Sequence, residues 1–328
     1  MKQTNWGVLG VSGHFIQRVV VPLSHSETVR VAAIASRNKG KAETAAKEWG
    51  IPKAYGSYEE LLADPELDAI YNPLPNHLHL EWIKKAADAG KPMLCEKPLG
   101  LNAAEVEEAI EYTRKKGVPL MEAFMYRFHP QWVRAKELSA CGEIGSVKIV
   151  QSHFTYNNTD PNNIRNQLQA GGGALMDIGC YAVSSARFIF GEEPTKVMSR
   201  VERSPEFGTD VFSSGILQFP SGQSTFTVST QTNDAQKVHI LGTGGSITIE
   251  VPFNIYPDVL MPSYITTGVG ERVHEAGPAD QYQLMFEAYS EALQAGNPVP
   301  TPMTDALNNQ KVLDALFRSE ESGAWEDV

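Results

Sequence analysis

The chain is poor in cysteine, in basic residues and in long apolar runs, and each scarcity excludes a class of protein. Its three cysteines, Cys95, Cys141 and Cys180, are far apart, so neither a disulfide framework nor a zinc ribbon is indicated. Acidic residues (39) outnumber Lys and Arg (28), and a net charge of −11 argues against a nucleic-acid partner, because phosphates require a basic face. No stretch approaches a membrane span, and the N-terminus lacks the apolar segment of a signal peptide. We therefore expect a cytoplasmic protein without a membrane partner.

Strand and helix patterns divide the chain into two parts. Up to about residue 122, short apolar strands alternate with helical segments, which predicts an α/β domain with a doubly wound parallel sheet. From 123 to 328, a helix is followed by alternating strands joined by glycine turns, and two helices end the chain. This pattern predicts an α+β domain with an open, mainly antiparallel sheet. A length of 328 residues also exceeds what one small core usually holds.

A glycine turn separates the first predicted strand from the first helix, which is the context of a dinucleotide-binding fingerprint. The turn reads Gly10-Val11-Ser12-Gly13-His14-Phe15, with Ser12 at the place of the second glycine of G-x-G-x-x-G. A tight strand–helix turn without a ligand is the alternative. The second strand ends in Ser36-Arg37, where an NAD site would have Asp or Glu for the ribose 2′-hydroxyl. A hydroxyl and a guanidinium suit a 2′-phosphate, so we predict a Rossmann domain that prefers NADP to NAD.

Polar residues also follow two later strands, at the sheet edge where such domains bind ligands. One loop is Asn72-Pro73-Leu74-Pro75-Asn76, and the other contains Glu96-Lys97-Pro98. Lys97 is a candidate reactive group, and a surface Glu–Lys pair is the alternative. His77 and His79 follow the first loop. They are two residues apart and point to different faces of a helix, so we expect no metal site, and either histidine could line the site.

Two segments of the second part contain further candidates. Asn163, Arg165 and Asn166 lie in a polar loop that could donate hydrogen bonds to a polyol. Gly171-Gly172-Gly173 precedes a predicted helix on which Asp177 and Tyr181, four residues apart, share a face. The alternative is that Asp177 complements the helix dipole and Tyr181 packs in the core. Arg127 and His129 lie where the chain leaves the first domain. They could be residues of the site, or they could pack the crossover between the domains.

These motifs together resemble the glucose–fructose oxidoreductase / inositol dehydrogenase / MocA family. The resemblance rests on Gly10-x-Ser12-Gly13, Glu96-Lys97-Pro98, the segment 123–130 and the segment 171–181, and it covers the whole chain. Tyr181 stands where inositol dehydrogenase-like members have histidine. This tyrosine is similar to the branch that contains dimeric dihydrodiol dehydrogenase and NADP-dependent xylose dehydrogenase.

The resemblance implies an NAD(P)-dependent enzyme that transfers a hydride between nicotinamide and a secondary alcohol or carbonyl of a sugar, cyclic polyol or dihydrodiol. It implies Lys97, Tyr181 and Asp177 as catalytic residues, with Lys97 lowering the pKa of Tyr181. The implied cofactor-binding residues are Gly10, Ser12, Gly13, His14, Phe15, Ser36, Arg37, Asn72, Pro73, Leu74, Asn76, His79, Glu96, Lys97 and Arg165. It also suggests pairing through the open sheet, hence a homodimer or higher homo-oligomer. The alternative from another class is a non-catalytic NADP-binding redox regulator. A second enzymatic alternative is reduction of a keto sugar or nucleotide sugar.

Overall fold

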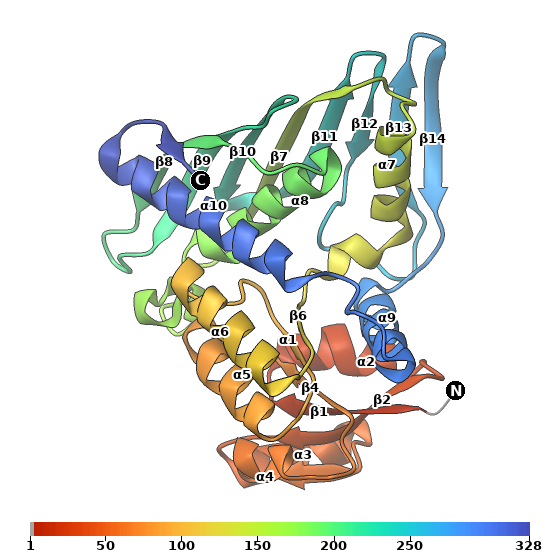
Figure 1. The fold of residues 1–328 in the computed structure, drawn as a ribbon, viewed down its shortest axis with the longest axis vertical. Coiled ribbons are helices and arrows are strands. Elements are labelled where there is room, and N and C mark those ends of the chain that lie inside the picture. Colours follow the sequence, from red (N-terminus) through yellow and green to blue (C-terminus); the bar gives the residue numbers. More distant parts are fainter. Residues whose placement is uncertain (1–2) are drawn as a thin grey trace. The chain divides into compact units, whose positions relative to one another are not determined.

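The computed structural model describes residues 3–328, except for the side chain of His14, as two compact units (Figure 1). The first unit comprises the chain up to Met125 together with Tyr282–Leu307, and the second comprises Tyr126–Gln281 and Asn308–Val328. The sequence placed the domain boundary between residues 122 and 123. It also assigned residues 282–307 to the second domain, whereas here they pack with the first unit.

The first unit contains a six-stranded parallel sheet of order β3-β2-β1-β4-β5-β6, which is the strand order of the Rossmann fold. The sequence predicted every strand but β3. Apolar residues of both sheet faces are buried, as expected for strands covered on both sides. The strands are β1 (Thr4–Leu9), β2 (Val29–Ala35), β3 (Lys53–Tyr55), β4 (Ala69–Asn72), β5 (Met93–Cys95) and β6 (Leu120–Glu122).

The helices α3, α4 and α6 of the first unit begin after residues whose side chains accept one of the first free amide N–H groups. Asn38, Ser57 and Asn102 each accept from the residue three positions on, and Gly50 and Gly117 end their helices in the left-handed conformation. The first helical stretch changes from α to π and back. The elements are α1 (Gly13–Phe15), η1 (Ile16–Val20), α2 (Val21–Leu23), α3 (Lys39–Trp49), α4 (Tyr58–Leu62), η2 (Asn76–Leu78), α5 (His79–Asp88) and α6 (Ala103–Lys116).

Helix α9 (Gln281–Ala295) joins the first unit although it lies far along the sequence. The indole N–H of Trp6 in β1 donates to Ser290 Oγ at 3.0 Å. The hydroxyl of Tyr289 lies 3.1 Å from the carbonyl oxygen of Met93, at the start of β5. The ring of Phe286 packs against Trp6 with centroids 4.6 Å apart. The apolar face of α9 therefore completes the core beneath the Rossmann sheet.

The second unit contains a nine-stranded sheet of order β14-β13-β12-β11-β7-β10-β9-β8-β15. It is mainly antiparallel, as predicted; the pair β7 and β10 is parallel. Two of the predicted glycine turns, at residues 220–222 and 242–245, join β9 to β10 and β11 to β12 as hairpins. The sequence did not predict β13, β14 or β15. The strands are β7 (Val147–Asn157), β8 (Lys196–Arg203), β9 (Asp210–Gln218), β10 (Gln223–Ser229), β11 (Gln231–Gly242), β12 (Gly245–Ile249), β13 (Met261–Thr267), β14 (Gly270–Ala276) and β15 (Glu326–Asp327).

Helices of the second unit lie against one face of this sheet (Figure 1). Trp132, Phe154 and Phe253 form a buried aromatic core between helix and sheet, with the Phe154 and Phe253 rings stacked 5.2 Å apart. Helix α10 begins in the first unit and continues in the second. The elements are η3 (Met125–Phe128), α7 (Pro130–Ala140), η4 (Ile164–Asn166), η5 (Leu168–Ala170), η6 (Leu175–Gly179), α8 (Cys180–Phe190) and α10 (Met303–Ser322).

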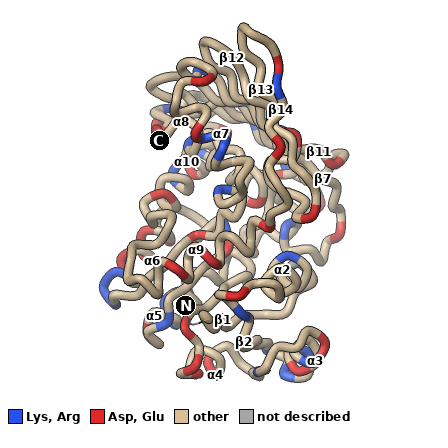
Figure 2. Tube along the Cα trace, turned by 90° about the vertical axis from the view of Figure 1, so that its right-hand side faces the viewer, with Lys and Arg blue, Asp and Glu red and all other residues tan. Residues whose placement is uncertain are grey.

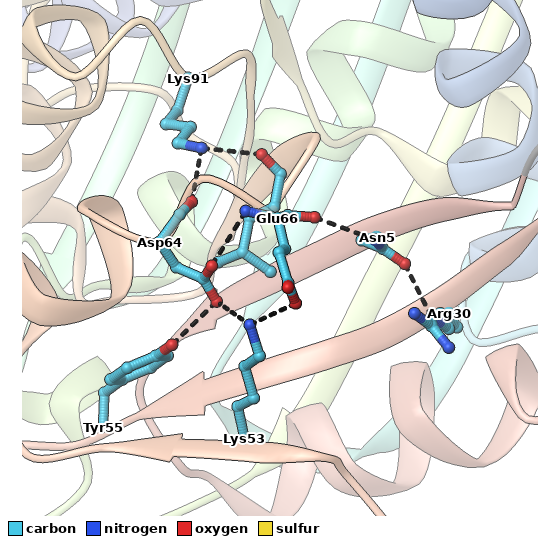
Figure 3. Close-up of polar contacts among 8 residues, drawn as sticks. Asn5, Arg30, Lys53, Tyr55, Asp64, Glu66 and Lys91 are labelled. Atoms are coloured by element: carbon cyan, nitrogen blue, oxygen red, sulfur yellow. Dashed lines mark hydrogen bonds and ion pairs between the residues drawn. The ribbon is translucent and has the colours of Figure 1, made fainter.

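A polar cluster lies at the amino ends of the Rossmann strands and connects them by hydrogen bonds and ion pairs (Figure 3). The buried carboxylate of Asp64 accepts hydrogen bonds from Lys53 Nζ and Tyr55 Oη, each at 2.8 Å. Lys91 Nζ donates to the carbonyl oxygens of Asp64 and Leu67 at 2.7 and 2.8 Å. Because ligands of such sheets bind at the carboxyl ends of the strands, we assign this cluster to stability.

Charges of both signs are intermingled over the helices of the first unit (Figure 2). Lys84–Glu108 and Lys116–Asp88 are ion pairs with nitrogen–oxygen distances of 2.6 Å. Such exposed pairs contribute little to stability. Among residues 3–328, no helix is long and apolar enough to cross a bilayer.

Candidate functional site

The turn after β1 has the geometry that a dinucleotide-binding site requires. Gly10 has a φ of 108°, a conformation that favours glycine, and an added Cβ would lie 3.4 Å from Leu74 Cδ2. Ser12, the departure from the glycine pattern, caps the helix by accepting from Phe15 N at 3.1 Å. Ser12 and Gly13 are exposed, whereas the Phe15 side chain is buried beside Tyr71. Any contact of Phe15 with a cofactor would therefore involve its backbone. The predicted role of the His14 side chain lies outside the described residues.

Arg37 is exposed at the carboxyl end of β2, as the sequence predicted. Ser36 Oγ accepts from Asn38 N at 3.2 Å, which fixes the turn. Burial raises the pKa of the Tyr58 hydroxyl, and the positive charge of Arg37 acts in the opposite direction, so the guanidinium lies beside Tyr58. An added Cβ on Gly10 would be 3.8 Å from the same hydroxyl. A guanidinium and a hydroxyl therefore lie close together beside the glycine turn.

Hydrogen bonds of two buried side chains, Asn72 and His79, fix the loop after β4. The amide of the buried Asn72 donates to Cys95 Sγ at 3.4 Å, and its Oδ1 accepts from Leu74 N at 3.2 Å. His79 is fully buried, and its ring nitrogens lie 2.7 Å from Leu74 O and 3.0 Å from Pro98 O. Burial lowers the pKa of His79 to about 4, so the ring is neutral near pH 7. His79 therefore links the loop after β4 to the loop after β5.

Glu96 and Lys97 lie at the carboxyl end of β5, where the sequence placed them. Tyr71 donates its hydroxyl proton to Glu96 Oε1 at 2.5 Å, and the backbone N–H of Lys97 donates to Glu96 Oε2 at 3.3 Å. The Lys97–Pro98 peptide is cis. Lys97 is partly exposed and contributes to the lowered pKa of His79 through its charge. The first unit thus gathers Gly10, Asn72 and Lys97 at one edge of the sheet.

In the second unit, the predicted helix over Asp177 and Tyr181 begins as a π-helix, η6, and continues as α8. Gly173 has a φ of 123°, and an added Cβ would lie 1.9 Å from Asp210 Oδ1. Asp210 Oδ2 accepts from Leu175 N at 2.6 Å and from Ser213 Oγ at 2.9 Å. The glycine run therefore lets the Asp210 carboxylate reach the start of the π-helix, a type of helix that often occurs at functional sites.

Asp177 is the centre of a polar cluster. Its Oδ2 accepts a hydrogen bond from Tyr156 Oη at 2.7 Å and from Arg165 Nε at 2.9 Å. Burial, followed by the charge of Asp177, raises the pKa of Tyr156, so this hydroxyl remains a proton donor. Tyr156 ends a strand that the sequence predicted, but no local signal indicated that it meets Asp177. Asp210 was likewise missed, because strand patterns do not show which carboxylate caps a distant helix.

The Tyr181 side chain is 5% exposed and lies among aromatic rings. Its ring centroid is 5.1 Å from that of Phe253 and 5.8 Å from that of Phe154. Tyr181 lies one helical turn after Asp177, and its interaction with Arg165 makes a small contribution to the raised pKa of that arginine. The structure thus brings together Asp177, Tyr181 and Arg165 within the second unit.

Arg127 and His129 have packing contacts. Arg127 Nη2 donates to Ser184 Oγ at 2.7 Å, and its guanidinium lies 5.5 Å from the Phe188 ring centroid. His129 is buried at the start of α7, where its Nδ1 accepts from Gln131 N at 3.2 Å. Burial lowers the pKa of His129 to about 4. In the described part of the chain, no group of three or more His, Cys, Asp or Glu residues has a metal-binding arrangement.

Comparisons with known proteins agree with this architecture. Residues 4–124 match the oxidoreductase family with an NAD-binding Rossmann fold, and residues 132–248 match the GFO/IDH/MocA C-terminal domain. The chain is 39% identical to D-xylose 1-dehydrogenase (NADP(+)) 2 of Haloferax volcanii, over 97% of this chain and 98% of that protein. It is 37% identical to the trans-1,2-dihydrobenzene-1,2-diol dehydrogenase of Mus musculus, over 75% of this chain and 74% of that protein.

A solved structure is similar over the full length. The aldose–aldose oxidoreductase of Caulobacter crescentus, complexed with glycerol, superposes with a TM-score of 0.92 at 26% identity, covering 100% of both chains. The family matches, the relatives and the Rossmann strand order lead to one assignment. The chain belongs to the GFO/IDH/MocA family of NAD(P)-dependent oxidoreductases.

Proposed function

We propose that this protein is an NADP-dependent dehydrogenase or reductase that acts on a secondary alcohol or carbonyl of a sugar, cyclic polyol or dihydrodiol. The observation that carries the proposal is the pair Asp177 and Tyr181 at the start of one helix, with the Asp177 carboxylate held by two donors. The relatives support the substrate class, since D-xylose and the dihydrodiol both have hydroxyl groups on neighbouring carbons.

The chain's own residues suit NADP better than NAD. Arg37 and Ser36 are the residues that would hold the 2′-phosphate, and the turn of Gly10, Ser12 and Gly13 would hold the pyrophosphate. The loop of Asn72, Pro73, Leu74 and Asn76 would lie against the nicotinamide ribose, with His79 and Glu96 fixing the two loops. When bound, NADP supplies the acceptor or donor of the hydride.

The protein must then move one proton at the substrate oxygen. In the oxidative direction, Tyr181 Oη accepts the proton of the alcohol, and in the reductive direction it donates a proton to the carbonyl oxygen. The ammonium of Lys97 favours the phenolate form and so lowers the barrier to this transfer. Asp177 holds a neighbouring hydroxyl of the substrate. The same residues support the reduction of a keto sugar, because the two directions use one set of groups.

The test is the substitution Tyr181→Phe, which keeps the ring but removes the transferable proton. We expect kcat to fall by about 10²- to 10⁴-fold, with little change in NADPH affinity. Lys97→Met should cause a comparable loss and move the pH–rate limb upward, and the double variant should be little worse than either single variant. The assay follows NADPH absorbance with aldoses, ketoses and cyclic diols.

Two results would count against the proposal. If Tyr181→Phe keeps kcat within a few-fold of the wild type, Tyr181 packs and another group transfers the proton. If the wild type binds NADPH tightly but turns over none of these compounds, the regulator is favoured instead.

A further inference from the structure

Arg165 is a partly exposed arginine that contacts the candidate catalytic residue Asp177. Its Nε donates to Asp177 Oδ2 at 2.9 Å. The two terminal nitrogens form no hydrogen bond with any of the residues 3–328, and the side chain is 37% exposed. An arginine has five N–H donors in a fixed fork, so one engaged Nε leaves four directed N–H groups.

The backbone around Arg165 fixes where these donors point. Arg165 N donates to Asn163 Oδ1 at 3.1 Å, and Arg165 O accepts from Gly173 N at 2.9 Å. An added Cβ on Gly172 would lie 2.4 Å from Arg165 O, so the glycine run permits this close approach. A side chain that is held at its backbone and at its Nε loses little entropy when its terminal nitrogens bind a ligand.

The charge balance of the cluster indicates what kind of ligand fits. The Asp177 carboxylate, followed by smaller contributions that include Tyr181, raises the pKa of Arg165 against the effect of burial. Because Asp177 already compensates the positive charge of Arg165, an anionic group gains little from binding here. A neutral hydroxyl, which accepts from one partner and donates to another, suits a neighbouring arginine and carboxylate.

We propose that Arg165 determines substrate specificity by donating from its terminal nitrogens to a hydroxyl on the carbon next to the reacting carbon. The preferred substrate is therefore a vicinal diol or its α-hydroxy carbonyl partner. This inference rests on the proposed role of Tyr181 as the residue at the reacting oxygen. Tyr156 is a positioning residue, because its hydroxyl shares Asp177 Oδ2 with Arg165 Nε and so fixes the carboxylate beside the guanidinium.

The experiment compares trans-1,2-cyclohexanediol with cyclohexanol, which differ by one hydroxyl. We expect kcat/KM of the wild type to favour the diol, and Arg165→Met to reduce this preference by about 10- to 100-fold, the effect of hydrogen bonds from a charged donor. Arg165→Lys keeps the charge beside Asp177 but lacks the fork, so it should also lose most of the preference. The exposed Arg200 of β8 provides the matched control, and Arg200→Met should keep the wild-type preference.

Three results would overturn the proposal. Arg165→Lys could keep the wild-type preference for the diol, or Arg165→Met could lose kcat/KM equally for both alcohols. Arg165→Met could also lose NADPH affinity by a comparable factor. The last result would assign Arg165 to the cofactor, as the sequence analysis expected. Saturation-transfer NMR on the enzyme–NADP complex tests diol binding without turnover. Arg165-dependent diol binding without turnover would support this inference while the proposed function fails. Sugar turnover that is unchanged in Arg165→Met would support the proposed function and contradict this inference.

Discussion

At the scale of single residues, the role proposed for Arg37 is to distinguish two cofactors that differ by one phosphate. Charge-assisted hydrogen bonds contribute roughly 1.5–3 kcal/mol, or about 10- to 100-fold in affinity. Arg37→Asp should therefore weaken NADP binding by that factor relative to NAD binding, measured by fluorescence titration of both reduced cofactors. Lys47→Glu, on the exposed side of α3, makes the same change in charge and should leave the NADP/NAD ratio unchanged. Equal loss for both cofactors in Arg37→Asp would contradict the assignment.

Asp64 stabilises the folded state, and the size of this stabilisation depends on pH. Burial acts to raise the pKa of Asp64, but hydrogen bonds from Lys53, Glu66 N and Tyr55 outweigh this, and the pKa is lowered. Because the pKa of Asp64 is lower in the folded state, its ionised carboxylate stabilises the fold at pH values above the unfolded pKa of about 3.9. This stabilisation is lost as the pH falls through the pKa of the folded state. Asp64→Asn should therefore cost about 1–3 kcal/mol of unfolding free energy at pH 7.

The check is chemical unfolding of wild type and Asp64→Asn at pH 7 and at decreasing pH below 4. The difference between them should shrink as the pH falls. Glu66→Gln changes the exposed ion-pair partner of Lys53, and we expect it to lower the unfolding free energy by less than about 1 kcal/mol. A pH-independent difference would show that packing, rather than the charge of Asp64, stabilises the cluster.

At the scale of elements, the glycine run before η6 is needed by the helix that follows it. Gly173→Ala places a Cβ 1.9 Å from Asp210 Oδ1 and keeps a left-handed φ of 123°. We expect a loss of at least about 1–3 kcal/mol of stability from the backbone alone, together with a lower kcat/KM, because Asp177 and Tyr181 follow on the same helix. Thermal unfolding and steady-state rates measure the two effects. Gly277→Ala, where an added Cβ meets nothing within 4 Å, is the matched control.

Other elements show where local patterns suffice. Asn38, Ser57 and Asn102 can be recognised as caps from the sequence, because a cap and its amide partner are three positions apart. Strand β13 was missed because it contains a proline, and strand β14 because it is mostly polar and exposed. Their pairing, β13 with β12 and β14 with β13, depends on the neighbouring strand in each case. The π-helical turn before α8 was also missed, since the contact of Asp210 with Leu175 N joins residues 35 positions apart.

At the scale of the whole molecule, the face of the second sheet opposite its helices is a candidate interface (Figure 1). Residues of β7, β10 and β11 line a hollow of about 330 Å³ there, including Gln151, His153, Thr225, Thr227, Lys237 and His239. The resemblance suggests that such a face pairs with a second copy. We expect a homo-oligomer, most simply a two-fold dimer. Sedimentation at micromolar concentration should show it, and Thr225→Arg with Thr227→Arg should dissociate it. Thr44→Arg on α3 is the control, and a wild-type monomer would refute the prediction.

The sequence by itself determined the fold class, the Rossmann strands with the exception of β3, and the places of Arg37, Lys97, Asp177 and Tyr181 in their elements. These follow from periodicity, caps and motif spacing, which act over a few residues. Only the tertiary structure decided that α9 joins the first unit, that His79 bridges two loops, and that Tyr156 and Arg165 share one oxygen of Asp177. The reason is physical: such contacts depend on which buried surfaces and hydrogen-bonding groups meet after the chain has folded, and no local pattern records that partner.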